Sequence, residues 1–143
     1  MNQNLLAQDA NLIVTGALPA ATASTTSSSA LDLDEGANGG PDQFAPERVN
    51  FNLNAPALST TQLPDAKTVT YSIWSSPNAD LSDPVEYIPS AIVQTGAGGD
   101  GAATANLAFA LPASINRYLF ANATTGSATG NCSAASMTLS ARF

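Results

Sequence analysis

Residues 102–143, AATANLAFALPASINRYLFANATTGSATGNCSAASMTLSARF, decide the fold of this chain. In the last part of this stretch, Met137, Leu139 and Ala141 alternate with polar or charged residues. A period of two is that of a β-strand with one buried and one exposed face. The stretch therefore predicts that the chain is organised around regular, half-buried strands.

Two further strands are predicted in the same stretch. Residues 105–111 alternate in the same way, and Pro112 ends them because proline cannot extend an interior ladder. Residues 117–122 carry apolar side chains at both parities. We expect that strand to be covered on both faces.

The first half of the chain contains two more alternating segments. Residues 48–55, RVNFNLNA, place apolar residues between asparagines, and residues 68–74, TVTYSIW, do so between hydroxyl residues and Trp74. Residues 75–90 carry three prolines and are expected to form a long connection with at most a short strand at 85–88. Residues 91–95, AIVQT, then lead into a glycine-rich loop at 96–101.

The N-terminal region is less regular. Residues 1–24 are interpreted as an arm with one short strand near 11–15, and the Ser/Thr-rich run that follows suits an edge strand or a linker. Residues 25–143 then form a single domain. The predicted fold is all-β, a jelly-roll-like antiparallel β-sandwich of about eight strands with an extended N-terminal arm.

Composition excludes several functions. The chain has 143 residues, a net charge of -7, four Lys and Arg residues, one cysteine and no histidine. Nucleic-acid binding is not expected without clustered cations, and no apolar run has the length of about 20 residues that a membrane span needs. The missing histidine excludes a Ser-His-Asp site, and a conventional zinc site is not expected in a chain with one cysteine and no histidine. We predict no enzyme activity and no cofactor.

Carboxylates and aromatic residues leave two alternatives open. Asp32 and its acidic neighbours could approach the acids of residues 80–86, as paired carboxylates do in glycoside hydrolysis or in calcium binding. Trp74 and Tyr71 could form a sugar-stacking platform, although a strand tryptophan is more often buried. A carbohydrate-binding or adhesin-like sandwich is therefore the alternative function.

The closing stretch also resembles a known family. A Leu-Pro turn, an Arg-Tyr-Leu strand start, a turn of small residues and a last strand are similar to the C-terminal part of tailed-phage capsid decoration, or cementing, proteins, particularly the Bordetella-phage cementing family. The resemblance covers residues 67–143 and is strongest at five positions: Leu111, Pro112, Arg117, Tyr118 and Leu119.

This resemblance implies a structural virion protein. Such a protein would bind the outer capsid surface, bridge neighbouring major capsid subunits and stabilise the mature shell. It implies the major capsid protein as partner, a homo-oligomer (dimer or trimer), and synthesis in the host cytoplasm. Residues expected at the capsid or subunit interface are Leu5, Leu6, Leu12, Ile13, Val14, Arg48, Trp74 and Arg117.

Overall fold

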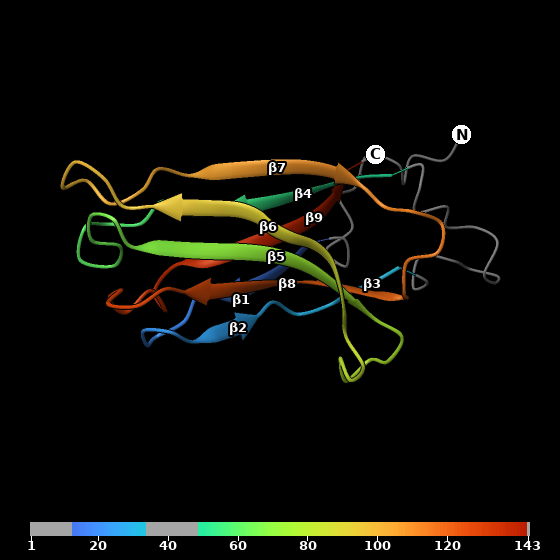
Figure 1. Cartoon of the computed structure of the whole chain (residues 1–143). Helices are drawn as coiled ribbons and strands as arrows, with labels where there is room; N and C mark the ends of the chain where they lie inside the picture. Colours follow the sequence, from blue (N-terminus) through green and yellow to red (C-terminus); the bar gives the residue numbers. More distant parts are fainter. Residues whose placement is uncertain (1–12, 34–48, 143) are drawn as a thin grey trace.

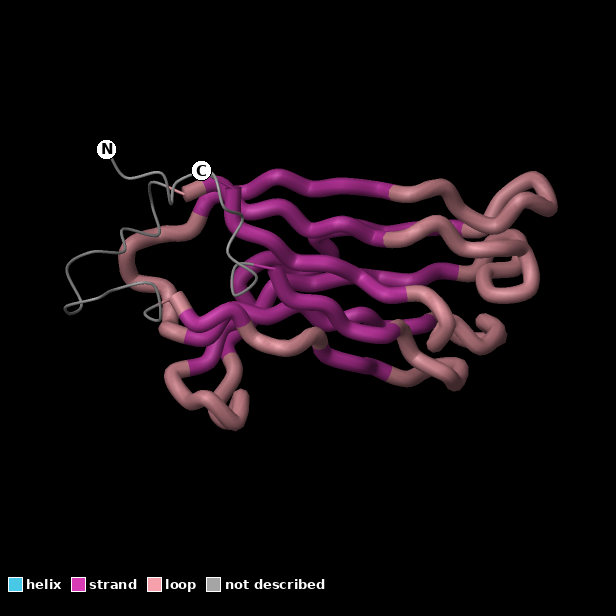
Figure 2. Tube along the Cα trace, turned by 180° about the vertical axis from the view of Figure 1, so that it is seen from behind, coloured by secondary structure: helices cyan, strands magenta, loops and turns pink. Residues whose placement is uncertain are grey.

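A computed structural model describes residues 13–33 and 49–142. Every regular element among them is a strand, and the strands form two antiparallel sheets that face each other (Figures 1 and 2). No helix in the described part of the chain is long and apolar enough to cross a membrane. The strands are β1 (Ile13–Ala17), β2 (Thr25–Ser27), β3 (Leu31–Asp32), β4 (Asn50–Ala55), β5 (Thr68–Ser76), β6 (Val85–Thr95), β7 (Ala105–Ala110), β8 (Tyr118–Thr125) and β9 (Ser136–Arg142).

The strand order is that of a jelly roll. One sheet, here called sheet A, has the order β1-β9-β4-β7, and the other, sheet B, has the order β2-β8-β5-β6 with β3 also paired to β8. Since β2 and β3 pair with successive parts of β8, they act as one interrupted strand and give two four-stranded layers. The predicted all-β, jelly-roll-like antiparallel β-sandwich is confirmed.

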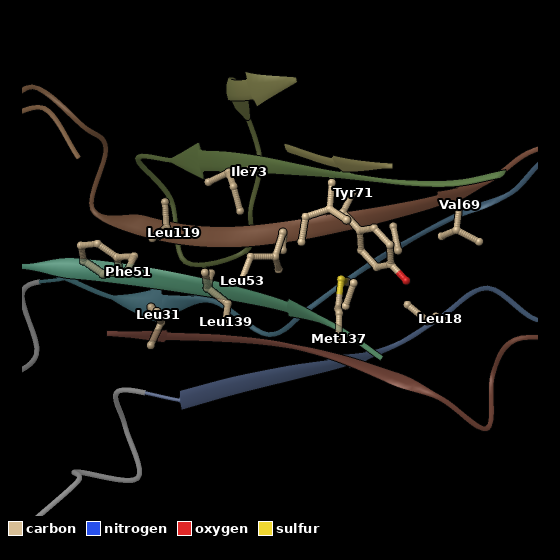
Figure 3. Packing of buried hydrophobic residues seen from close by; sticks show 14 of the residues in the cluster. Leu18, Leu31, Phe51, Leu53, Val69, Tyr71, Ile73, Leu119, Met137 and Leu139 are labelled. Carbon is tan, nitrogen blue, oxygen red and sulfur yellow. The ribbon is translucent and has the colours of Figure 1, made fainter. Parts of the chain in front are cut away.

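The inward faces of the strands are those that the alternation predicted. The core between the sheets is built from long aliphatic and aromatic side chains of both sheets (Figure 3). Tyr71 of β5, Phe51 of β4 and Leu139 of β9 are fully buried. On β8, Leu119 is buried on the inner face and Phe120 on the outer one, but Asn122 is half-buried and Thr124 exposed, so the prediction of a strand covered on both faces holds only at Phe120.

The strand expected near residues 11–15 lies at Ile13–Ala17 and pairs with β9 along its whole length. It is therefore part of sheet A, and the sandwich already includes residue 13, within the region assigned to the arm. The Ser/Thr run forms β2, the edge strand of sheet B.

The prediction for residues 75–90 is wrong in its second half. Instead of a connection with at most a short strand, β6 runs for eleven residues from Val85 to Thr95 and includes Pro89. Proline is tolerated there because β6 lies at the edge of sheet B and has a bulge at this point. Ile88 lies opposite Ile73 and Ile92 opposite Tyr71, so that residues 89–91 face Ser72 alone.

Candidate functional site

The residues predicted for an interface are scattered in the structure. Leu5, Leu6, Leu12 and Arg48 lie outside the described residues. Ile13 and Val14 are half-buried on β1, the edge strand of sheet A next to β9. Trp74 lies on the outer face of sheet B, and Arg117 lies just before β8. The structure does not gather the described members of this set into one surface.

Arg117 forms an ion pair with Asp32 of β3. Its Nε and Nη2 atoms each donate to a carboxylate oxygen of Asp32 at 2.7 Å, and its guanidinium carbon lies 5.1 Å from the centre of the Tyr118 ring. Bidentate pairing fixes both side chains, so the arginine ties β3 to the start of β8. Asp32 is thereby engaged in an ion pair.

The other motif residues form a corner between the sheets. Leu111 and Leu119 are buried, whereas Pro112 is exposed and its carbonyl accepts a hydrogen bond from the N–H of Ile115 at 3.1 Å. This turn carries the chain from β7 in sheet A to β8 in sheet B. The five positions that carry the family resemblance therefore have an evident structural role.

The most exposed apolar surface lies at the side of the sandwich where β6 and β7 run next to each other (Figure 1). Both are edge strands, and no further described strand lies beyond them. Val85 is 56% exposed and Tyr87 36%, and inward-facing residues of both strands are only half-buried. We call this surface the β6–β7 wall; its residues are Val85, Tyr87, Ile88, Ala91, Leu107 and Phe109.

Few polar contacts join the two strands across this wall. The Tyr87 hydroxyl donates to the carbonyl of Ala110 at 3.2 Å, near one end. Near the other end, the Gln94 amide nitrogen donates to the carbonyls of Ala103 and Pro56 at 2.8 and 2.7 Å. Its amide oxygen accepts from the buried hydroxyl of Tyr71 at 2.8 Å. The wall is thus held at its ends and leaves the apolar side chains between them partly open.

The segment of sequence that contains the β6–β7 wall carries charges of a single sign. Residues 68–116, which include β5, β6 and β7, contain Asp80, Asp83, Glu86 and Asp100 but no lysine or arginine. Hydrogen bonds from the Ser82 hydroxyl and then from its N–H lower the pKa of Asp80, which keeps this exposed carboxylate ionised. Glu86 pairs with Trp74 across the strands, so both side chains point to the outer face of sheet B.

The opposite side of the sandwich, where β1 meets β2, is closed by polar contacts. The N–H of Ser29 donates to the carbonyl of Thr15 at 3.2 Å, and the Thr26 hydroxyl donates to the carbonyl of Ala17 at 2.7 Å. A Cβ on Gly16 would stand 2.5 Å from the Ser28 Cα, so the two backbones touch. We call this side the β1–β2 wall.

The outer face of sheet B is mostly polar. Neighbouring strands place Thr25 against Thr124 and Ser27 against Asn122, with hydroxyl contacts at 2.8 and 2.6 Å. Trp74 is half-buried at one end of this face, and its indole N–H donates to the Ser72 hydroxyl at 2.7 Å. This face has hydrogen-bonding groups and the partly accessible ring of Trp74.

Catalytic groups do not converge in the described residues. They contain no cluster of three or more His, Cys, Asp or Glu side chains placed to hold a metal ion. Burial raises the pKa of the Cys132 thiol, which disfavours the reactive thiolate. Burial, and to a lesser extent Cys132, raises the pKa of Tyr71.

The sequence analysis did not propose the β6–β7 wall residues for an interface. A signal was present, because residues 85–95 place valines, isoleucines and Tyr87 around Pro89 in a segment without cations. Apolar residues that flank a proline are typical of an edge strand that stays partly open.

Comparisons with known proteins give little further guidance. No protein-family model matches the chain, and no curated protein matches it. Among solved structures, a chain of the empty virus-like particle of cowpea mosaic virus is similar in fold, with 14% sequence identity and a TM-score of 0.45. The match covers 92% of this chain and 78% of that chain. A likeness this distant carries no conclusion about function, and the jelly-roll assignment rests on the strand order.

Proposed function

We propose that this chain is a structural protein of a virus particle. In this role it binds the outer capsid surface as tailed-phage decoration proteins do, bridges neighbouring coat subunits and stabilises the shell. The observation that carries the proposal is the β6–β7 wall, a partly open apolar surface in the described part of the sandwich, whose β1–β2 side is closed by polar contacts. An exposed apolar surface on a folded domain often marks a site of interaction with another molecule.

The remaining properties of the chain agree with this role. The sheets are joined by a continuous core, which gives a rigid body suited to bridging two subunits (Figure 3). The class of partner that we propose, the major capsid protein, is taken from the resemblance of residues 67–143 to decoration proteins. Fold alone would not do so, because jelly rolls serve many functions.

Attachment as a closed dimer or trimer would strengthen binding. Linked copies convert the second and third contacts into intramolecular events, which raises the overall affinity without any new kind of contact. Weak individual contacts of small area are then sufficient for stable decoration.

The experiment is to add the purified full chain to capsid shells that lack it. We expect the chain to sediment with the shells and to raise the temperature at which they release DNA. Shells already carrying the protein serve as the control and should take up no more. Unchanged shell stability at saturating binding would contradict the stabilising role, and no binding would contradict the proposal as a whole.

Carbohydrate binding is a second candidate, favoured by the outer face of sheet B. Trp74 offers a partly accessible ring, and Ser72, Asn122 and Ser27 provide hydrogen-bonding groups on the same face. A glycan array with the wild-type chain and Trp74→Ala tests it. Hits that disappear in the variant would support this function, and an array without hits would remove it.

A further inference from the structure

We propose that the β6–β7 wall binds an extended segment of a different protein, which adds as a strand to β6 at Val85–Ile88. Its alternate residues are apolar, facing the wall, and basic, facing Glu86. The identification of this partner as a coat protein rests on the proposed function. The binding chemistry itself comes from the wall and holds without that identification.

The apolar half of this recognition comes from inward-facing residues that remain partly uncovered. Ile88 pairs with the fully buried Ile73, and Leu107 and Phe109 pair with the fully buried Leu53 and Phe51, so all three point into the sandwich. They remain only half-buried because their strands end the two sheets. An added strand would cover them with the side chains of one of its faces.

The backbone of β6 directs the partner to its first half. Pro89 has no N–H, and Ser90 has a positive φ of 48° beside the bulge, so the edge is not one continuous template. Val85–Ile88 lies before this interruption, has a second register shift of its own at Tyr87, and carries Val85, the most exposed large apolar residue described. The predicted contact is therefore short, with about four paired residues on each strand.

The partner is expected to carry basic residues because acidic residues of this chain lie beside Val85–Ile88. Glu86 is exposed on the outer face of β6, and Asp83 and Asp80 are exposed in the turn that leads into it. The segment of residues 68–116 that contains them has no lysine or arginine. A lysine or arginine directly across from Glu86 would gain a favourable cross-strand pair.

The same charges argue against a second copy of this chain as the occupant. Two β6 strands paired with each other would bring together two acidic segments that have no cation of their own. Each would also have to fit the bulge of the other at Pro89. A homo-oligomer would therefore form through another surface.

The first test uses peptides and the isotopically labelled full chain. One eight-residue peptide alternates Val and Lys, and the control peptide alternates Val and Glu. We expect the Val/Lys peptide to shift the amide NMR signals of β6 and β7 and to bind at least tenfold more tightly than the control. Equal binding of the two peptides, or shifts confined to other strands, would overturn the proposal.

The second test uses matched variants of exposed residues. Val85→Lys and Glu86→Lys should each weaken binding of the Val/Lys peptide about tenfold. Val93→Lys is the control, because Val93 is 51% exposed on the same strand but pairs with Thr70 and points to the outer face. Equal losses in Val93→Lys and Val85→Lys would contradict the assignment. So would a change of oligomeric state in Val85→Lys, which would make a second copy the occupant.

Binding to capsid shells, measured for the wild-type chain and for Val85→Lys, distinguishes a failure of this inference from a failure of the proposed function. If wild-type chain and Val85→Lys bind shells equally, the wall is not the attachment site and the inference fails while the function stands. If the wild-type chain binds the Val/Lys peptide at the wall but does not bind shells, the function fails and the inference stands.

Discussion

At the β1–β2 wall the two sheets meet through backbone and hydroxyl groups, whereas at the β6–β7 wall apolar side chains between the two strands stay half-exposed. Gly16 allows the first wall to close, because the backbone of β1 lies so near Ser28 that a Cβ atom at position 16 would collide with the Ser28 backbone. The second wall has only end contacts, at Tyr87 and Gln94. One fold thus seals one side with polar contacts and keeps the other available.

This difference has an energetic meaning. Closing a wall with hydrogen bonds satisfies edge-strand backbone groups, which removes a template for pairing with other chains. At an apolar wall, residues such as Phe109 are incompletely buried in the free protein. The favourable free energy of burying their remaining apolar surface is gained when a partner covers them. The comparison predicts that the two walls respond differently to the same kinds of change.

The largest effect should come from the two rings that stack between β4 and β7. Phe51 and Phe109 have ring centres 5.8 Å apart, but Phe51 is fully buried whereas Phe109 is half-buried at the open wall. We expect Phe51→Ala to lower the free energy of unfolding by about 4 kcal/mol and Phe109→Ala by about 2 kcal/mol. Urea unfolding measures both, and equal losses would mean that the wall is closed.

A larger side chain at Gly16 tests the closed wall. Gly16→Val places side-chain atoms against the Ser28 backbone, so we expect a loss of about 3 kcal/mol. The adjacent exposed Thr15→Val should change stability by less than about 0.5 kcal/mol. Thermal unfolding distinguishes them, and a wild-type melting temperature for Gly16→Val would refute the close approach.

A smaller effect is expected at the hydroxyl that anchors the same wall to β8. The Ser28 hydroxyl accepts from the buried N–H of Ala121 at 3.0 Å and donates to the carbonyl of Ser29 at 2.7 Å. Ser28→Ala leaves that N–H unsatisfied and should cost about 1.5 kcal/mol. Ser27→Ala, at an exposed neighbour, is the control and should cost less than about 0.5 kcal/mol.

The smallest effect concerns the acid in the turn before the open wall. The pKa of Asp80 is lowered by its hydrogen bonds from Ser82, so its contribution to stability is present above its unfolded pKa and is lost as pH falls through the folded pKa. An NMR titration should show its carboxyl resonance changing below the usual range for aspartate. Ser82→Ala should return the pKa toward its usual value; an identical titration curve in that variant would contradict this cause.

Local alternation made much of the fold predictable from the sequence. Residues 68–74 and 136–141 have unambiguous apolar faces, and those faces are buried. The eleven-residue β6 was not predicted because Pro89, judged only from its neighbours in the sequence, argues against a continuous strand. Only the non-local position of β6, at the end of a sheet, makes proline acceptable there.

The candidate site was less predictable for the same reason. Which strands become edges depends on pairing between segments far apart in the sequence, such as β4 with β7 and β5 with β8. The sequence analysis therefore chose apolar residues of the arm, Trp74 and Arg117, and passed over Val85 and Tyr87. Arg117 proved to be paired with Asp32, which its charge alone could not indicate.

Hydrogen-deuterium exchange of the free and shell-bound protein tests the central claim most directly, because it reports both walls in one measurement. We expect the amides of Val85–Ile88 to gain protection on binding while those of β1 and β2 keep the exchange rates of the free protein. Protection gained at the β1–β2 wall, with none at Val85–Ile88, would contradict it.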